Sequence, residues 1–297
     1  MKVYIKIYAL LFFGFLLFSS HEMWGETLSF DQAVIKTLSL SPKLRIAGSE
    51  VNEAVGAQVQ SGLYPNPVAG WSVENVFGNK NWQGWESVES RYEIGQLIEL
   101  GGKRGFRMQT AKFQYYAAEA GFEARQLSVL NRLLKLFTLV VAAQENLDVT
   151  LDQTKIAEEV YKTVVAKVEA GKVSLIQQNK AEIALSTAQI NLDKAKAEFF
   201  KSKERLAVLW GAMCPDFERV IYPFYEIDLP IPIESCLCAL RDNPQLLKSQ
   251  MDYMAAHQNL HLEKSRAIPD VTVSLGYKTL QDTGNKGMIL GASIPIP

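Results

Sequence analysis

The longest feature of the hydrophobic pattern is a stretch without proline from Lys103 to about Glu169. Within it, apolar or small residues recur at steps of three and four, which is the period of a coiled-coil seam. A helix over this span would be about 100 Å long at 1.5 Å per residue, so it must pack lengthwise against other helices. The seam positions are Leu133, Leu136, Val140, Ala143, Leu147, Thr150, Thr154, Ala157, Tyr161, Val164 and Val168.

A break in this pattern follows at Gly171, a residue that suits the left-handed position at the end of a helix. Ser174 suits the N-cap of a second helix, predicted from about Leu175 to Leu209 and ended by Gly211. Together the two helices form an antiparallel hairpin. The seam positions of the second helix are Leu185, Ala188, Leu192, Ala195, Phe199, Ser202, Leu206 and Leu209.

Four short stretches alternate between apolar and polar residues with a period of two, which predicts strands with one apolar face. Each is close to the 9–11 residues of a strand that crosses a membrane, and four strands cannot close a barrel by themselves. Closure would require several copies of the chain, whereas a soluble sandwich is the alternative for the same strands. The stretches are Val68 to Phe77, Arg91 to Leu100, Val271 to Thr279 and Met288 to Ile296, with polar hairpin tips at Gly78 to Ser87 and Gln281 to Gly287.

The N-terminus has the pattern of a secretory signal, expected to occupy residues 1–25. Lys2 and Lys6 precede an unbroken apolar run from Ile7 to Phe18, which is short for a membrane-spanning helix. An uncleaved membrane anchor is the alternative. No later stretch reaches about 18 consecutive apolar residues, so strands are expected to make any membrane crossing of the exported protein.

The chain also repeats itself at a spacing of about 200 residues. Leu28 to Val34 recurs as Ile231 to Leu237, and each copy leads into a helical stretch, Arg45 to Gly62 in the first and Leu247 to Arg266 in the second. Two strands follow in both. The predicted organisation is a first repeat at 26–210, a linker at 211–230 and a partial second repeat at 231–297.

Composition narrows the function. The chain has 297 residues, 21% of them charged, and a formal net charge of -1, which argues against nucleic-acid binding. Cys214, Cys236 and Cys238 are too few for a disulfide framework and are expected to be buried thiols, although a disulfide involving Cys214 is conceivable in an oxidising compartment.

Sites for chemistry are sparse in the sequence. His257 and His261 are four residues apart on a predicted helix, but no third ligand accompanies them, so a solvated helix face is expected rather than a metal site. Gly101 to Arg104 is superficially similar to a phosphate loop, yet it lacks the spaced first glycine and the Ser or Thr. We expect neither enzymatic activity nor a cofactor.

The ordered combination of motifs resembles the TolC-like family of outer-membrane efflux proteins. The motifs are the Leu28 to Val34 helix start with Ser41-Pro42, Asn66-Pro67 before the first strand, Glu99 to Arg104 after the second strand, Gly171 at the hairpin tip, Asn243-Pro244, and Ile268 to Asp270. The Glu-Leu-Gly-Gly-Lys-Arg form is similar to that of channels that work with heavy-metal pumps.

The resemblance implies a mixed but mostly α-helical fold. Each chain would contribute four transmembrane strands to a trimeric 12-stranded barrel, and its coiled-coil hairpin would form part of a tunnel wall. It also implies a passive exit duct for small molecules or metal ions, located in the outer membrane with a periplasmic extension. Partners would be two further copies, outer-membrane lipid, a periplasmic adaptor protein and an inner-membrane pump.

The resemblance assigns adaptor contact to the hairpin tip, whose residues are Gly171, Lys172, Val173 and Ser174. Glu74, Glu93 and Glu99 are candidates for facing the lumen, where a wet surface needs polar groups in any case. A second hairpin is expected after the last strand and is absent from the sequence, so the chain is interpreted as a fragment or a natural truncation. The alternative function is an exported coiled-coil interaction protein without channel activity.

Overall fold

The computed structural model describes residues 27–76, 85–223 and 230–296. The predicted signal peptide, the end of the first predicted strand at Phe77, and most of its hairpin tip lie outside these residues. The fold is mostly helical with some strands, as the sequence predicts. The chain divides into two compact units, one formed by Met1–Arg45 with Gln126–Pro230 and the other by Ile46–Arg125 with Ile231–Pro297.

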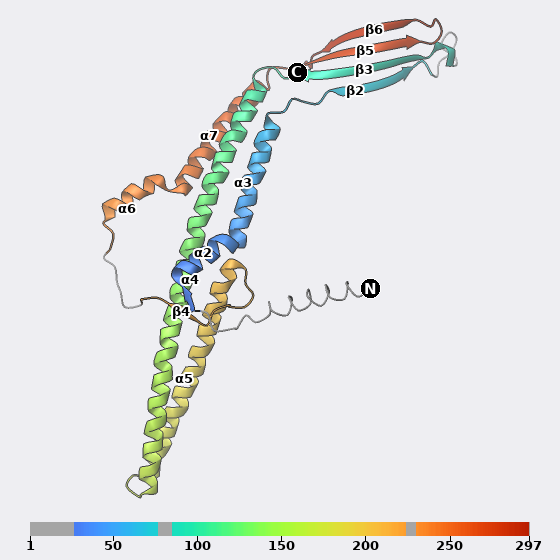
Figure 1. Cartoon of the computed structure of the whole chain (residues 1–297). Coiled ribbons are helices and arrows are strands. Elements are labelled where there is room, and N and C mark those ends of the chain that lie inside the picture. The colour runs from blue at the N-terminus through green and yellow to red at the C-terminus, as the bar shows by residue number, and fades with distance from the viewer. Residues whose placement is uncertain (1–26, 77–84, 224–229, 297) are drawn as a thin grey trace, which may run out of the picture. The chain divides into compact units, whose positions relative to one another are not determined.

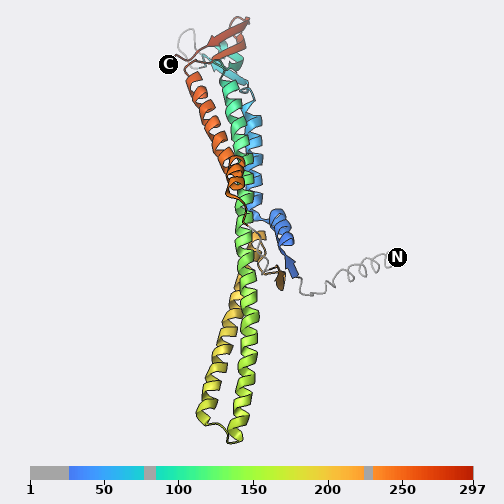
Figure 2. The same ribbon diagram turned by 90° about the vertical axis from the view of Figure 1, so that its left-hand side faces the viewer.

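The first unit contains the predicted antiparallel hairpin (Figure 1, Figure 2). Helix α4 spans Lys103–Glu169, with its residues from Gln126 onward in this unit, and α5 spans Leu175–Ala207. All the predicted seam positions on both helices are buried or half-buried, so the heptad pattern identified the facing sides correctly. By length and composition α4 would also suffice to cross a membrane, a test that a core helix passes as well.

The core of this unit lies where α2 (Phe30–Leu40) meets the hairpin. Ser29 caps α2 through a capping box with Gln32, and this box satisfies donors at the helix start. Phe30 meets Phe137 of α4 edge-to-face, with ring centroids 5.3 Å apart. The fully buried core side chains include Leu133, Phe137, Val140 and Leu206.

A short parallel pair of strands, which the hydrophobic pattern does not predict, completes the first unit. β1 (Thr27–Ser29) pairs with β4 (Arg219–Ile221), and β4 lies inside the segment expected to be a linker. The amide of Gln144 on α4 binds both the N–H and the C=O of Val220, at 2.9 and 3.1 Å. Because Val220 is buried in the core, this segment packs as part of the unit as well as connecting the two halves.

The second unit contains α3 (Pro42–Ser61) from Ile46 onward, the first part of α4, α6 (Ile233–Ala239), the 3-10 turn η4 (Leu240–Asp242) and α7 (Pro244–Ser265). No residue of α6 is buried. The expectation of buried thiols was therefore wrong, because Cys236 and Cys238 lie on this uncovered helix. Cys214, just after the turn that ends the hairpin, is exposed too, and all three thiols are free.

The four predicted strands form one antiparallel sheet in the order β2-β3-β5-β6 (Figure 1). The strands of the two sequence repeats therefore pair with each other, β3 with β5. A 3-10 turn, η2 (Trp85–Ser87), precedes β3. The strand bounds are Val68–Glu74 for β2, Glu89–Ile98 for β3, Val271–Leu280 for β5 and Lys286–Ser293 for β6.

Candidate functional site

One face of the sheet is apolar and exposed. A row of paired residues crosses all four strands on this face, Trp71 with Tyr92, Tyr92 with Tyr277, and Tyr277 with Met288. The rings of Trp71 and Tyr92 are stacked, with centroids 6.4 Å apart. Tyr and Trp concentrate at the boundary between hydrocarbon and water, so this row has the composition of an aromatic girdle.

Below the aromatic row the same face continues with mostly aliphatic residues, and the one polar side chain of β3 among them, Gln96, donates hydrogen bonds to the carbonyls of Pro65 and Leu97. Ile94 pairs with Leu275, and Ile98 pairs with Val271 at the other end of β3. From Tyr92 to Ile98 the strand advances about 20 Å at 3.4 Å per residue, which approaches the roughly 25 Å height of an apolar band facing lipid. Beyond the aromatic row, toward the hairpin tips, Thr279 pairs with Lys286, so the apolar band ends there.

The opposite face is polar and rich in glycine. Close to the hairpin tips it carries Glu74, Glu89, Arg91 and Lys278, which are neighbours across the strands. Arg91 lies 4.0 Å from Glu74, and Lys278 forms an ion pair with Glu89. This arrangement gives the polar face two bases and two acids within a short distance, with no net charge.

Farther from the tips, Glu93 lies on the polar face between Gly70 and Gly276. It has no ion-pair partner in the part of the chain that the structure describes. It borders a hollow of about 410 Å³ that is also lined by Thr272, Ser274 and other small residues. Two of the three predicted lumen candidates, Glu74 and Glu93, thus share the face opposite the aromatic row.

The outer edges of β2 and β6 have no strand partner among the described residues. In a bilayer every backbone N–H and C=O must find a partner inside the protein, because hydrocarbon offers none. A sheet with an apolar face and two open edges is therefore an incomplete structure for that environment.

The connection between β3 and α4 is tightly built. Gly101 and Gly102 both have positive φ, at 70° and 73°, and a Cβ on Gly101 would come within 3.0 Å of the Ile268 side chain. Lys103 then donates hydrogen bonds of 2.6 Å to the carbonyl of Ile268 and to Oδ1 of Asp270. The hydrogen bond from Lys103 lowers the pKa of Asp270 below its ordinary value.

Two arginines near the start of α4 bind the end of α3 and the residues just after it. Arg107 forms a two-pronged pair with Glu99, at 2.5 and 3.0 Å, and donates to the carbonyls of Ser61 and Leu63. The hydrogen bond to Glu99 raises the pKa of Arg107. Glu99, the third lumen candidate, is thus held by Arg107, and its side chain is only 11% exposed. Arg104 donates a hydrogen bond to the carbonyl of Gly62, and its guanidinium lies over the ring of Tyr64.

The hairpin tip is an ordered turn. Gly171 has φ of 67°, its N–H bonds to the carbonyl of Val168, and the N–H of Lys172 reaches the carbonyl of Lys167, each at 2.9 Å. This is the Schellman pattern that closes helices with a left-handed glycine. Ser174 stands at the N-cap of α5 as predicted, although its side chain makes no capping hydrogen bond. Gly171, Lys172 and Ser174 are exposed and Val173 is half-buried.

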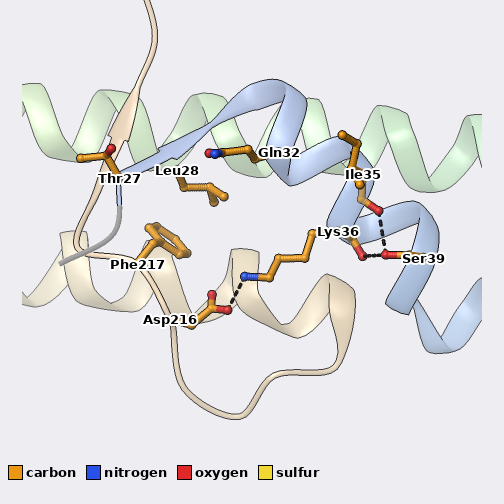
Figure 3. A pocket seen from close by; sticks show the side chains of 8 residues that line it. All are labelled: Thr27, Leu28, Gln32, Ile35, Lys36, Ser39, Asp216 and Phe217. Atoms are coloured by element: carbon orange, nitrogen blue, oxygen red, sulfur yellow. Dashed lines mark hydrogen bonds and ion pairs between the residues drawn. The ribbon is translucent and has the colours of Figure 1, made fainter. Parts of the chain in front are cut away.

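A hollow in the first unit lies between α2 and the segment before β4 (Figure 3). It measures about 340 Å³, with Leu28 and Phe217 on its apolar side. Lys36 and Asp216 form an ion pair across it, and Lys36 also lies 5.6 Å from the Trp210 ring centre. Because Lys36 and Asp216 already pair with each other, their contact connects α2 to the segment before β4, and we do not assign the hollow a binding or catalytic role.

His257 and His261 lie on α7 as neighbours, with ring centroids 4.8 Å apart. His261 also stacks on Phe106 of α4 and is half-buried, whereas His257 is exposed. Across the described ranges, no group of three or more His, Cys, Asp or Glu residues could hold a metal ion.

The chain thus combines an amphipathic antiparallel sheet with open edges and a long antiparallel helical hairpin. A family model described as "Outer membrane efflux protein" matches residues 53–212, which is more than half of the chain. The chain therefore belongs to the outer membrane efflux protein family, as its motifs predict, and is a protein of the outer membrane.

Curated relatives agree with this family. The chain is 26% identical over 254 residues to the cobalt-zinc-cadmium resistance protein CzcC of Cupriavidus metallidurans, covering 86% of this chain and 59% of the relative. It is 25% identical over 273 residues to the nickel and cobalt resistance protein CnrC of the same organism, covering 92% and 64%. The chain thus spans about three fifths of the length of the curated relatives it matches.

Solved structures show the same fold at low identity. Crystal structures of CusC, described in terms of folding and transmembrane channel formation, match with a TM-score of 0.71 at 15% identity, covering 92% of this chain and 66% of that one. The Campylobacter jejuni CmeC outer membrane channel matches with a TM-score of 0.71 at 18% identity, covering 90% and 61%. Both solved structures are described as channels or in terms of channel formation.

Proposed function

We propose that the chain is the outer-membrane subunit of a tripartite efflux or secretion system and forms a passive exit duct for small molecules or metal ions. The observation that carries the proposal is the four-stranded sheet with one apolar exposed face, one polar face and two open edges. Three copies would join β2 of one to β6 of the next and close a 12-stranded barrel, which leaves no edge in the hydrocarbon.

In this barrel the aromatic row at Trp71, Tyr92 and Tyr277 faces lipid near one surface of the membrane. Glu74 and Glu93 face the water-filled lumen, where their charges influence which ions enter. Glu99 stands at the base of the strands with its charge matched by Arg107. Its main contribution is therefore to hold the strands on α4.

The hairpin supports the proposal because each of its helices has an exposed apolar stripe on the side away from the seam between them. Ile176, Ile183 and Ile190 are exposed on α5 at seven-residue spacing, and Val149 and Ile156 are exposed on α4 at the same spacing. A heptad stripe is built for lengthwise contact with another helix. We propose that hairpins pack side by side through these stripes into a periplasmic tunnel.

Residues 171–174 at the tip are the proposed contact for a periplasmic adaptor protein, which would connect the duct to an inner-membrane pump. Their exposure and the rigid Schellman turn support this role, since a preorganised loop loses little entropy on binding. The names of the relatives CzcC and CnrC support divalent transition metals as the exported class.

The organisation that goes with this function is an exported chain with residues 1–25 as signal peptide. It has a first repeat at 26–210, a connecting segment at 211–230 and a partial second repeat at 231–297. The element order supports it, because a helix pair and two strands precede α4 and recur as α6, α7, β5 and β6. The packing of β4 gives the connecting segment a structural role as well.

The test is native mass spectrometry of the protein extracted from outer membranes in detergent. A trimer is the expected result, and the measured mass reports the length of the mature chain at the same time. A trimer of much longer chains would mean that this sequence is part of a longer channel subunit. A soluble monomer missing from the membrane fraction would contradict the channel and favour an exported coiled-coil interaction protein.

A further inference from the structure

The pair His257 and His261 on α7 has no role in the sites described above. Residues four apart on a helix project from the same face one turn apart. The two rings are in contact, with centroids 4.8 Å apart and planes at 72°. Neither imidazole makes a hydrogen bond or ion pair in the part of the chain that the structure describes. Two adjacent imidazoles therefore have nitrogen atoms without a partner there.

This spacing matches what a metal ion requires. Zinc binds imidazole nitrogen at about 2.0 Å, so two rings on one tetrahedral zinc have centroids about 5 Å apart. The observed 4.8 Å is close to that value, and two histidines at i and i+4 on one helix are an established way to bind zinc. Rotation about the side-chain torsions is the movement that would direct both nitrogens at one ion.

The surroundings preorganise one of the two ligands. His261 is stacked on Phe106 of α4, with ring centroids 5.6 Å apart and planes at 18°. This contact restricts the imidazole to few orientations and lowers the entropy lost when a metal binds. His257 is exposed and leaves the site open to solvent, so water can supply the remaining ligands.

We propose that His257 and His261 form a binding site for a divalent transition-metal ion such as Zn²⁺, Ni²⁺ or Co²⁺. Imidazole suits these ions, whereas Mg²⁺ and Ca²⁺ prefer oxygen ligands. With two protein ligands the site is open and the ion exchanges readily. The proposal goes beyond the proposed function, because the chain binds the ion here whether or not it forms a duct.

The test is calorimetric titration of Zn²⁺ into the full chain, purified without a histidine tag. All three cysteines are replaced by Ser throughout, because exposed thiols bind zinc as well. We expect one ion per chain in this background. His257→Gln and His261→Phe each weaken binding by about tenfold or more, and His261→Phe keeps an aromatic ring against Phe106.

A matched control keeps the number of histidines and changes only their spacing. His257→Gln combined with Asn259→His places two histidines two apart, on different faces of α7, and we expect it to bind as weakly as the single variants. Circular dichroism of every variant checks that the helices remain folded. If the edge-to-face contact is only aromatic packing, the background protein binds no zinc, or all variants bind it equally. Either result would overturn the proposal.

Discussion

The bond between Lys103 and Asp270 gives the sharpest test of how the strands are attached to the helices. Lys103→Met keeps most of the aliphatic stem but removes the hydrogen bonds to the Ile268 carbonyl and the Asp270 carboxylate, both 2.6 Å long. The side chain of Lys103 is 10% exposed and that of Asp270 22% exposed, so water replaces these bonds only in part.

The magnitude follows from this burial. Removing one partner of a fully buried pair costs about 3–5 kcal/mol, and the partial access of water to Asp270 reduces this to about 2 kcal/mol. That free energy corresponds to about a 30-fold increase in the population of locally opened molecules. The N–H of Leu100 is a convenient reporter, because it donates to the same Asp270 oxygen at 2.9 Å.

Hydrogen–deuterium exchange with mass spectrometry measures this opening on the detergent-purified protein. We expect the peptide that contains Leu100 to exchange about 30 times faster in Lys103→Met. The matched control is Lys162→Met on the same helix, where an exposed pair with Glu158 contributes about 0.5 kcal/mol or less. If both variants change the exchange of their own segments equally, or if Lys103→Met changes it less than about threefold, the reasoning is refuted.

Three further predictions concern stability at low pH, the hairpin tip and the two faces of the sheet. Because the pKa of Asp270 is lowered in the folded protein, the ionised carboxylate stabilises the fold fully above its ordinary pKa near 4, and this stabilisation is lost as the pH falls through the folded-state pKa. Asp270→Asn should remove this part of the acid sensitivity when hydrogen exchange is measured over a series of pH values. Gly171→Ala should destabilise the tip by about 1–2 kcal/mol because of its positive φ, whereas Gly105→Ala, in open helical surroundings, should be neutral or slightly stabilising in the same exchange assay. Leu275→Lys puts a charge on the apolar face at a cost of about 2–4 kcal/mol and should reduce the trimer recovered from outer membranes, whereas Ser274→Lys on the polar face should not; equal recovery would contradict the assignment of the faces.

Much of the helical part could be predicted because its signals are local. The heptad spacing from Leu133 to Val168 identified the buried side of α4, and Gly171 marked the turn before α5. Period-two alternation identified the strands and their apolar faces, since neighbouring side chains in a strand must point to opposite sides. The predicted ends of the strands differ from the observed ends by a few residues, as with β6, which was predicted from Met288 and begins at Lys286.

Local sequence patterns did not predict the contacts between segments that lie far apart in the chain. The pairing of β1 with β4 joins residues far apart in the chain, and three-residue strands carry no periodicity to detect. The sequence marked Glu99 as a lumen candidate, but its pairing with Arg107 depends on how β3 meets α4. The exposure of Cys236 and Cys238 depends on what covers α6, which no pattern within that helix reports.

The sequence by itself determined the long helices and the four strands of the sheet, which side of each is apolar, and where the hairpin turns. These properties depend on residues within a few positions of one another, where period and glycine placement carry the information. Only the tertiary structure decided that the strands of the two repeats form one sheet, that Lys103 and Arg107 fasten the ends of other segments to α4, and that His261 stacks on Phe106. Those outcomes depend on contacts between residues more than forty positions apart in the chain, and one-dimensional patterns do not encode which partner a side chain meets.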